Sequence, residues 1–169
     1  SNEEKQAKFS INYFKTLKSR ASGGNSCCLT PLFTKNIKEV QKLREVINLN
    51  SKWAFTKNAT EIPTEVNNKW DFVNLPHCWN AIDGQDGGND YYRGTCYYAK
   101  ELDKAELPKA DLYYLEIKGA NSSADVYVNG KHLAHHDGGY STWRVNITEE
   151  LTEKSLLVIT VDNSPNDVV

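Results

Sequence analysis

Residues 124–130 read Ala124-Asp125-Val126-Tyr127-Val128-Asn129-Gly130 and lead into a second short segment at residues 132–135. Apolar and polar side chains alternate at the start of this stretch, which is the pattern of a strand with one buried face. The Asn-Gly dipeptide readily adopts the two positive φ angles that a tight hairpin turn requires. The stretch therefore predicts an antiparallel β-hairpin.

The two-residue period of the hairpin continues on both sides of it. Tyr113, Leu115 and Ile117 fall on one face of a predicted strand, with Tyr, Glu and Lys at the positions between and after them. Residues 156–161 form a near-continuous apolar run, which suits a strand covered on both faces. Other strands are predicted at residues 46–55, 70–75, 95–102 and 143–147. About eight short strands separated by Gly, Asn, Asp and Pro are typical of a two-sheet sandwich or barrel, so the predicted fold class is all-β.

The N-terminal part of the chain follows a different pattern. Residues 21–26 form a Gly-, Ser- and Asn-rich break, and residues 36–44 repeat apolar side chains at a helix-like spacing. Ahead of the break, the apolar residues at helix-like spacing are Phe9, Tyr13, Phe14 and Leu17. We therefore predict a partly helical N-terminal extension over residues 1–43 and a β-sandwich domain over residues 44–169.

The composition excludes several classes of function. Hydrophobic residues make up 39% of the chain and charged residues 25%, so the chain can form a core. The net charge is −2 without a long basic run, and nucleic acid is therefore not an expected partner. The absence of an apolar stretch of about 20 residues and the polar start predict no membrane association and a cytoplasmic location. The leading Ser1-Asn2 and the lack of Met indicate trimmed ends with a tag remnant.

The cysteines and histidines show no metal-binding pattern. The four cysteines are Cys27, Cys28, Cys78 and Cys96. None belongs to a CxxC unit with a matching second pair, so free thiols are expected, with a Cys78–Cys96 disulfide as the alternative. His135 and His136 would point to opposite faces of a strand and could not hold one metal together. We therefore predict neither a metal nor a cofactor.

Three segments, taken in order, resemble a known family. They are Leu75-Pro76-His77-Cys78-Trp79-Asn80 with Asp90-Tyr91-Tyr92-Arg93-Gly94, then residues 124–130 with Asp137-Gly138-Gly139-Tyr140, and finally Leu157-Val158-Ile159-Thr160-Val161-Asp162-Asn163. Together they resemble the N-terminal sugar-binding domain of family 2 glycoside hydrolases of the β-galactosidase type, over roughly residues 44–169. The resemblance implies a jelly-roll β-sandwich of the galactose-binding-domain type.

The resemblance also implies that the catalytic residues lie outside this chain. In the family, the domain precedes an immunoglobulin-like domain and a TIM barrel, and two barrel glutamates with carboxyls ~5 Å apart perform a retaining hydrolysis. This chain would be a non-catalytic domain, truncated at its C-terminal end, that shapes the pocket for a β-galactoside or related carbohydrate. Its parent would be a retaining β-galactosidase-like O-glycosidase, and a homo-oligomer is compatible with how such enzymes assemble. Glucuronide and mannoside specificities stay open.

The candidate site is the loop of residues 81–93. A pyranose needs polar groups for its hydroxyls and flat apolar faces for its C–H side, and this loop combines both. On the resemblance, Asn89, Asp90 and Arg93 are predicted to bind substrate. Two other interpretations stay open: Asp90 and Arg93 pair with each other in a turn, or the loop binds calcium, although its spacing does not match an EF-hand.

Two further classes of function fit the same fold. A free-standing carbohydrate-binding module would bind sugar by itself, and a purely structural β-sandwich would only pack and assemble. Affinity of the isolated chain for sugar would distinguish these alternatives from a pocket-shaping domain.

Overall fold

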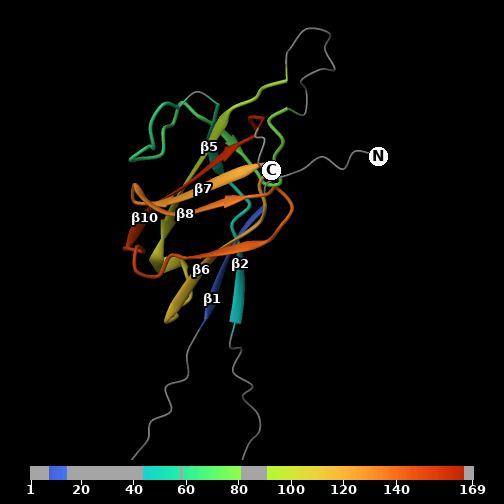
Figure 1. Ribbon diagram of the computed structural model, residues 1–169. Helices are drawn as coiled ribbons and strands as arrows, with labels where there is room; N and C mark the ends of the chain where they lie inside the picture. The colour runs from blue at the N-terminus through green and yellow to red at the C-terminus, as the bar shows by residue number, and fades with distance from the viewer. Residues whose placement is uncertain (1–7, 15–43, 58, 81–90, 166–169) are drawn as a thin grey trace, which may run out of the picture.

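The structure is a computed structural model that describes residues 8–14, 44–57, 59–80 and 91–165. Within these residues the chain forms two antiparallel sheets that make a sandwich (Figure 1). The four-stranded sheet has the order β2-β1-β6-β9, and the six-stranded sheet has the order β4-β3-β5-β10-β7-β8. The strands are β1 (Lys8–Phe14), β2 (Arg44–Asn48), β3 (Trp53–Thr56), β4 (Asp71–Val73), β5 (Thr95–Asp103), β6 (Leu112–Gly119), β7 (Ser123–Val128), β8 (Lys131–Asp137), β9 (Trp143–Asn146) and β10 (Lys154–Asp162). The predicted all-β sandwich is confirmed.

The main core lies between the two sheets. Trp53, Tyr98, Leu115, Ile117 and Ile159 are fully buried there, as the alternating pattern predicts. Each large apolar side chain that leaves water contributes about 1.5–3 kcal/mol to folding. The sandwich is therefore held together mainly by the facing sides of its sheets.

Strand β10 is buried on both faces because it lies in the middle of the six-stranded sheet, between β5 and β7. Leu157, Ile159 and Val161 point into the main core, whereas Leu156 and Val158 pack on the outer face. The outer cluster also contains Ala54 and Ala99, and the partly buried residues that pack against it are Ile62, Val66, Trp70 and Tyr127. The predicted two-sided strand is confirmed, and the connection between β3 and β4 contributes its outer cover.

The predicted hairpin is confirmed as β7 and β8, joined at Asn129 and Gly130 with φ angles of 51° and 81°. The Asn129 side chain has a second role. Its Oδ1 accepts a hydrogen bond from the Leu156 N–H (2.9 Å), and its Nδ2 donates to the Glu150 carbonyl (2.9 Å). The turn residue thus also fixes the start of β10.

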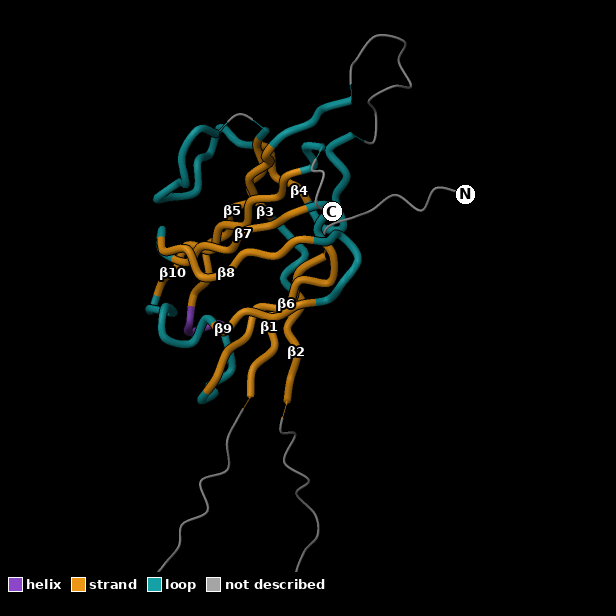
Figure 2. The backbone as a smooth tube through the Cα atoms, in the orientation of Figure 1, coloured by secondary structure: helices purple, strands orange, loops and turns teal. Residues whose placement is uncertain are grey.

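The helix predicted from Phe9 to Leu17 is wrong where the structure describes it. Residues 8–14 form strand β1, which pairs with β2 on one side and with β6 on the other (Figure 2). Residues four apart share a face in a strand as well as in a helix, so the spacing of Phe9 and Tyr13 fits both. Hydrogen bonds to β2 and β6 on its two sides stabilise residues 8–14 as a strand. Of the second predicted helix, residues 36–43 lie outside the described residues, and Arg44 begins β2.

Cys78 and Cys96 are free thiols, so the alternative of a disulfide between them is wrong. Burial raises the pKa of the Cys96 thiol to about 12, which keeps it protonated and unreactive at neutral pH. Cys27 and Cys28 lie outside the described residues. In the part of the chain that the structure describes, no helix has the length and apolar character needed to cross a membrane.

Candidate functional site at the Tyr92 turn

Residues 91–94, which precede β5, are held by two asparagine side chains. Asn80 Oδ1 accepts a hydrogen bond from the Tyr92 N–H (3.1 Å), and Asn80 Nδ2 donates to the Tyr92 carbonyl (3.0 Å). Asn163, just after β10, donates from Nδ2 to the same carbonyl (3.0 Å) and accepts from the Gly94 N–H (2.9 Å). We call this arrangement the asparagine clamp. It ties the turn to residues from two distant parts of the chain.

Tyr92 and Gly94 fix the turn further. The Tyr92 hydroxyl donates to the Lys57 carbonyl (2.8 Å), and the Lys57 ammonium lies 5.1 Å from the centre of the Tyr92 ring. Gly94 has a φ of +145°, and a Cβ added there would meet the Tyr92 hydroxyl at 3.2 Å. Glycine is therefore required for the backbone angle and for the close approach of the ring.

Asp162 anchors the strand ends beneath the turn. Its carboxylate accepts hydrogen bonds from Thr95 Oγ1 (2.5 Å) and from the Ser164 N–H (2.6 Å), and its carbonyl accepts from the Ser122 N–H (2.7 Å). Partial burial acts to raise the pKa of Asp162, but the hydrogen bonds from Thr95 and Ser164 outweigh it and lower the pKa. The carboxylate is thus ionised at neutral pH and braces β5 against β10.

Arg93 is the predicted site residue that the structure describes, whereas Asn89 and Asp90 lie outside the described residues. Arg93 is exposed, and its guanidinium lies 5.7 Å from the centre of the Tyr91 ring. Tyr91 is itself 58% exposed. A fixed turn therefore presents a cation and an aromatic side chain together to solvent.

Two aromatic residues near the clamp are held by the core. His77 Nδ1 lies 3.0 Å from the Tyr98 hydroxyl, and its ring meets Phe55 edge-on at 4.6 Å. Burial, with a smaller contribution from Lys57, lowers the pKa of His77, so this imidazole is neutral at neutral pH. Trp79 Nε1 is buried and has no hydrogen-bond partner among the described residues.

The histidines of β8 are separated as the strand period predicts. His135 contacts Asp125 (Nδ1 to Oδ1, 2.9 Å), while His136 stacks on Trp143 with ring centres 4.9 Å apart. His132 also contacts the same Asp125 oxygen at 2.7 Å. No group of three or more His, Cys, Asp or Glu residues in the described ranges has a geometry that could hold a metal.

The residues that position the turn are not among those predicted from the sequence. They are Asn80 and Asn163, which belong to two of the motifs quoted above. Their shared partner is the Tyr92 backbone, which no local pattern reveals. An asparagine at the end of a predicted strand gives only weak evidence for a side chain that holds a distant segment, since such asparagines are more often turn residues.

The fold is an antiparallel two-sheet β-sandwich, and comparison with known proteins places it among related domains. Residues 90–168 match the family model described as glycosyl hydrolase 2 galactose-binding domain-like. Over these residues the chain is similar to the galactose-binding-like N-terminal domain of glycoside hydrolase family 2.

Relatives in the family carry two kinds of name. The chain is 39% identical to a putative beta-glucuronidase of Formosa agariphila over 75% of this chain and 16% of that protein. It is 30% identical to a beta-galactosidase of Thermoanaerobacter pseudethanolicus over 71% of this chain and 17% of that protein. The structure of Bacteroides uniformis beta-glucuronidase 2, covalently bound to cyclophellitol-6-carboxylate aziridine, matches with a TM-score of 0.59 and 34% identity, over 69% of this chain and 14% of that one. The chain thus spans less than a fifth of the length of these three proteins.

Proposed function

We propose that this domain is a non-catalytic part of a retaining β-glycosidase and shapes the pocket in which the sugar binds. The contact with sugar is made by Arg93, together with Asn89 and Asp90, which shortly precede it in the sequence. The clamped turn is the observation that supports this proposal most strongly, because it fixes the backbone from which the exposed Arg93 and Tyr91 side chains project.

Rigidity at the turn matters because a positioning group acts through its location. A group that orients the sugar does so at a smaller entropic cost when its own freedom has been lost before binding. Four hydrogen bonds from Asn80 and Asn163 fix the backbone on both sides of Arg93. The turn is therefore preorganised for a contact made in the assembled enzyme.

The glycoside is either a β-galactoside or a β-glucuronide, since the relatives are named for both. The cationic Arg93 suits either sugar, because a guanidinium donates to hydroxyls and forms stronger, charge-assisted bonds to a carboxylate. The catalytic glutamates belong to a barrel in the longer protein. The downstream immunoglobulin-like and barrel domains are the partners that complete the pocket.

The proposal is tested on the purified chain with paired measurements. Nitrophenyl β-galactoside and nitrophenyl β-glucuronide are assayed for hydrolysis, and galactose and glucuronate are titrated by calorimetry. We expect neither nitrophenyl glycoside to be hydrolysed. We also expect no sub-millimolar binding of galactose or glucuronate at the Tyr92 turn. Turnover that co-purifies with the chain would contradict the proposal. Sub-millimolar galactose binding that Arg93→Ala abolishes would instead identify a free-standing carbohydrate-binding module.

A further inference from the structure

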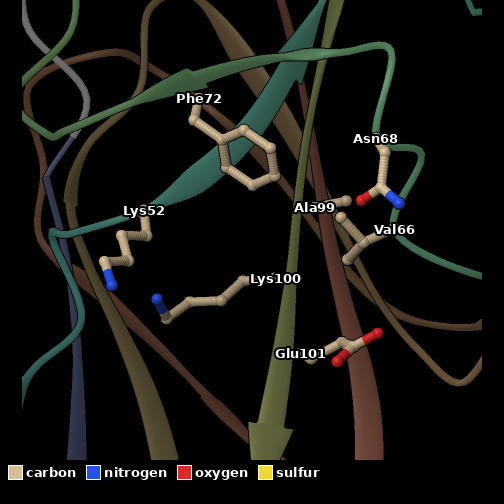
Figure 3. Close-up of a pocket in the computed structure, with 7 residues that line it drawn as sticks. All are labelled: Lys52, Val66, Asn68, Phe72, Ala99, Lys100 and Glu101. Carbon is tan, nitrogen blue, oxygen red and sulfur yellow. The ribbon is translucent and has the colours of Figure 1, made fainter.

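The outer face of the six-stranded sheet differs between its two edges. Near the β3–β4 edge, Phe72 and Ala99 are among the residues that line a groove of about 400 Å³ (Figure 3). On β7, Tyr127 packs against the outer cluster, so Asp125, two residues away, projects from the same face. Strand register places His135 of β8 opposite Asp125. Titratable groups therefore gather at the β8 edge of this face.

His135 lies between two carboxylates. Its Nδ1 is 2.9 Å from Asp125 Oδ1, and its Nε2 is 3.2 Å from Asp137 Oδ1. A neutral imidazole has one N–H donor and one lone pair, whereas an imidazolium has a donor on each nitrogen. An ionised carboxylate only accepts hydrogen bonds, so both contacts are hydrogen bonds only when His135 is charged. The geometry therefore favours the imidazolium form.

The neighbouring strands add one further titratable group to this cluster. His132, also on β8, approaches the same Asp125 oxygen at 2.7 Å and can donate to it from Nε2 as a neutral imidazole. On β10, Thr160 lies opposite Asp125 and is uncharged, while the Asp162 carboxylate bonds to residues at the start of β5 and after β10. Two carboxylates and one imidazole thus surround His135.

The contacts of His135 lie on a strand that has a neighbour on one side only. Within the described residues, β8 is the outermost strand of its sheet and pairs with β7 alone. The register shifts beside Val126, so a bulge separates residues 134–137 from the hairpin turn. Edge strands open locally more readily than central strands. His135 therefore ties to β7 the half of β8 that lies beyond the bulge.

We propose that His135 is a pH-sensitive latch on this edge of the sandwich. When charged, it bridges Asp125 on β7 and Asp137 at the end of β8. Loss of its proton leaves one donor and turns a lone pair toward the other carboxylate, so one of the two contacts is lost. The device goes beyond the proposed function, because it acts on the sheet edge and not on the sugar.

The direction of the pH dependence follows from the partners of His135. Hydrogen bonding to Asp125 is the main cause that raises the pKa of His135, and the charges of Asp125 and Asp137 add to it against a lowering by desolvation. The latch is therefore closed below the unfolded pKa of about 6.5 and opens as the pH rises through the folded pKa.

Opening of the latch should loosen β8 without detaching it. The three groups are partly exposed, and exposed ion pairs stabilise only weakly. On the inner face of the sheet, His136 still stacks on Trp143. We therefore expect local opening of residues 134–137 to change about two- to fivefold. This changes how often the backbone groups of the edge become available to another chain.

NMR spectroscopy of the ¹⁵N-labelled chain tests the latch directly. Imidazole ¹H–¹⁵N spectra between about pH 5 and pH 8 distinguish the imidazolium from the neutral tautomers. We expect His135 to be more than half charged at pH 6.5, and its titration midpoint to fall in Asp137→Asn. Glu65→Gln makes the same carboxylate-to-amide change at an exposed position of the β3–β4 connection and should leave the midpoint unchanged.

Amide hydrogen exchange of residues 134–137 measures the effect on the strand. After correction for the intrinsic rate, protection in the wild type should be about two- to fivefold lower at pH 8 than at pH 5, and His135→Gln should remove this difference. A His135 midpoint at or below 6.5, or equal protection at both pH values in the wild type, would overturn the proposal. A pH dependence that persists in His135→Gln would assign the effect to another group and would also overturn it.

Discussion

Replacement of Asn163 by alanine should release the Tyr92 turn and destabilise the domain by about 2 kcal/mol. The change removes two side-chain hydrogen bonds, to the Tyr92 carbonyl and from the Gly94 N–H. Each such bond contributes a net ~0.5–1.5 kcal/mol. The Tyr92 carbonyl keeps its second donor, Asn80 Nδ2 at 3.0 Å, so its loss is partly compensated, whereas the Gly94 N–H loses this acceptor. For a domain of this size the midpoint of thermal unfolding should fall by about 4–8 °C.

Urea and thermal unfolding, followed by tryptophan fluorescence, measure this loss. The matched control is Asn68→Ala, because Asn68 is exposed and forms no hydrogen bond with another described residue. Its effect should stay within about 0.5 kcal/mol. Hydrogen exchange at the Gly94 amide should also become faster in the Asn163→Ala variant. A variant as stable as the control, with unchanged exchange at Gly94, would refute the view that the clamp holds the turn.

Three further results are expected. Gly94→Ala should lower the free energy of unfolding by about 2 kcal/mol, because φ is +145° and the new Cβ would crowd the Tyr92 hydroxyl. A free energy of unfolding equal to that of the wild type would contradict this. Arg144→Ala should lower the free energy of unfolding by roughly 2 kcal/mol in a denaturant titration. The reason is that Arg144 Nε lies 2.7 Å from the carboxylate of Glu116, which is 5% exposed. A loss below about 0.5 kcal/mol would show that the pair contributes little. The pKa of Asp162 is lower in the folded state than its unfolded value of about 3.8. The ionised carboxylate therefore stabilises the fold fully above the unfolded pKa, and this stabilisation is lost as the pH falls through the folded pKa. Unfolding between pH 5 and pH 3 should therefore be less pH-dependent in Asp162→Asn than in wild type, and equal pH profiles would count against this role.

Local patterns were sufficient for the strands that border the core. Tyr113, Leu115 and Ile117 alternate with other residues and are buried, and residues 156–161 are apolar throughout because β10 has a sheet neighbour on each side and cover on both faces. Glu116 departs from the pattern. It lies between the apolar positions of the alternating pattern but is buried and paired with Arg144 on β9. An ion pair between strands cannot be read from one strand alone.

Long-range pairing explains what the sequence could not predict. Strand β1 is set by β2 and β6, so a segment with ambiguous spacing took its structure from partners far along the chain. The clamp combines Asn80, Tyr92 and Asn163 in the same way. Arg93 could be chosen from its motif, but the residues that hold it in place required the fold.

The central claim is that this domain positions sugar for chemistry performed elsewhere in a longer enzyme. The most direct test is steady-state kinetics of the full-length protein with Arg93→Ala, with Lys118→Gln as control. We predict that Arg93→Ala lowers kcat/KM for the preferred glycoside by about tenfold, the loss of one charge-assisted hydrogen bond, while thermal unfolding stays unchanged. Unchanged kcat/KM for both galactoside and glucuronide would contradict the account and leave the domain a structural role alone.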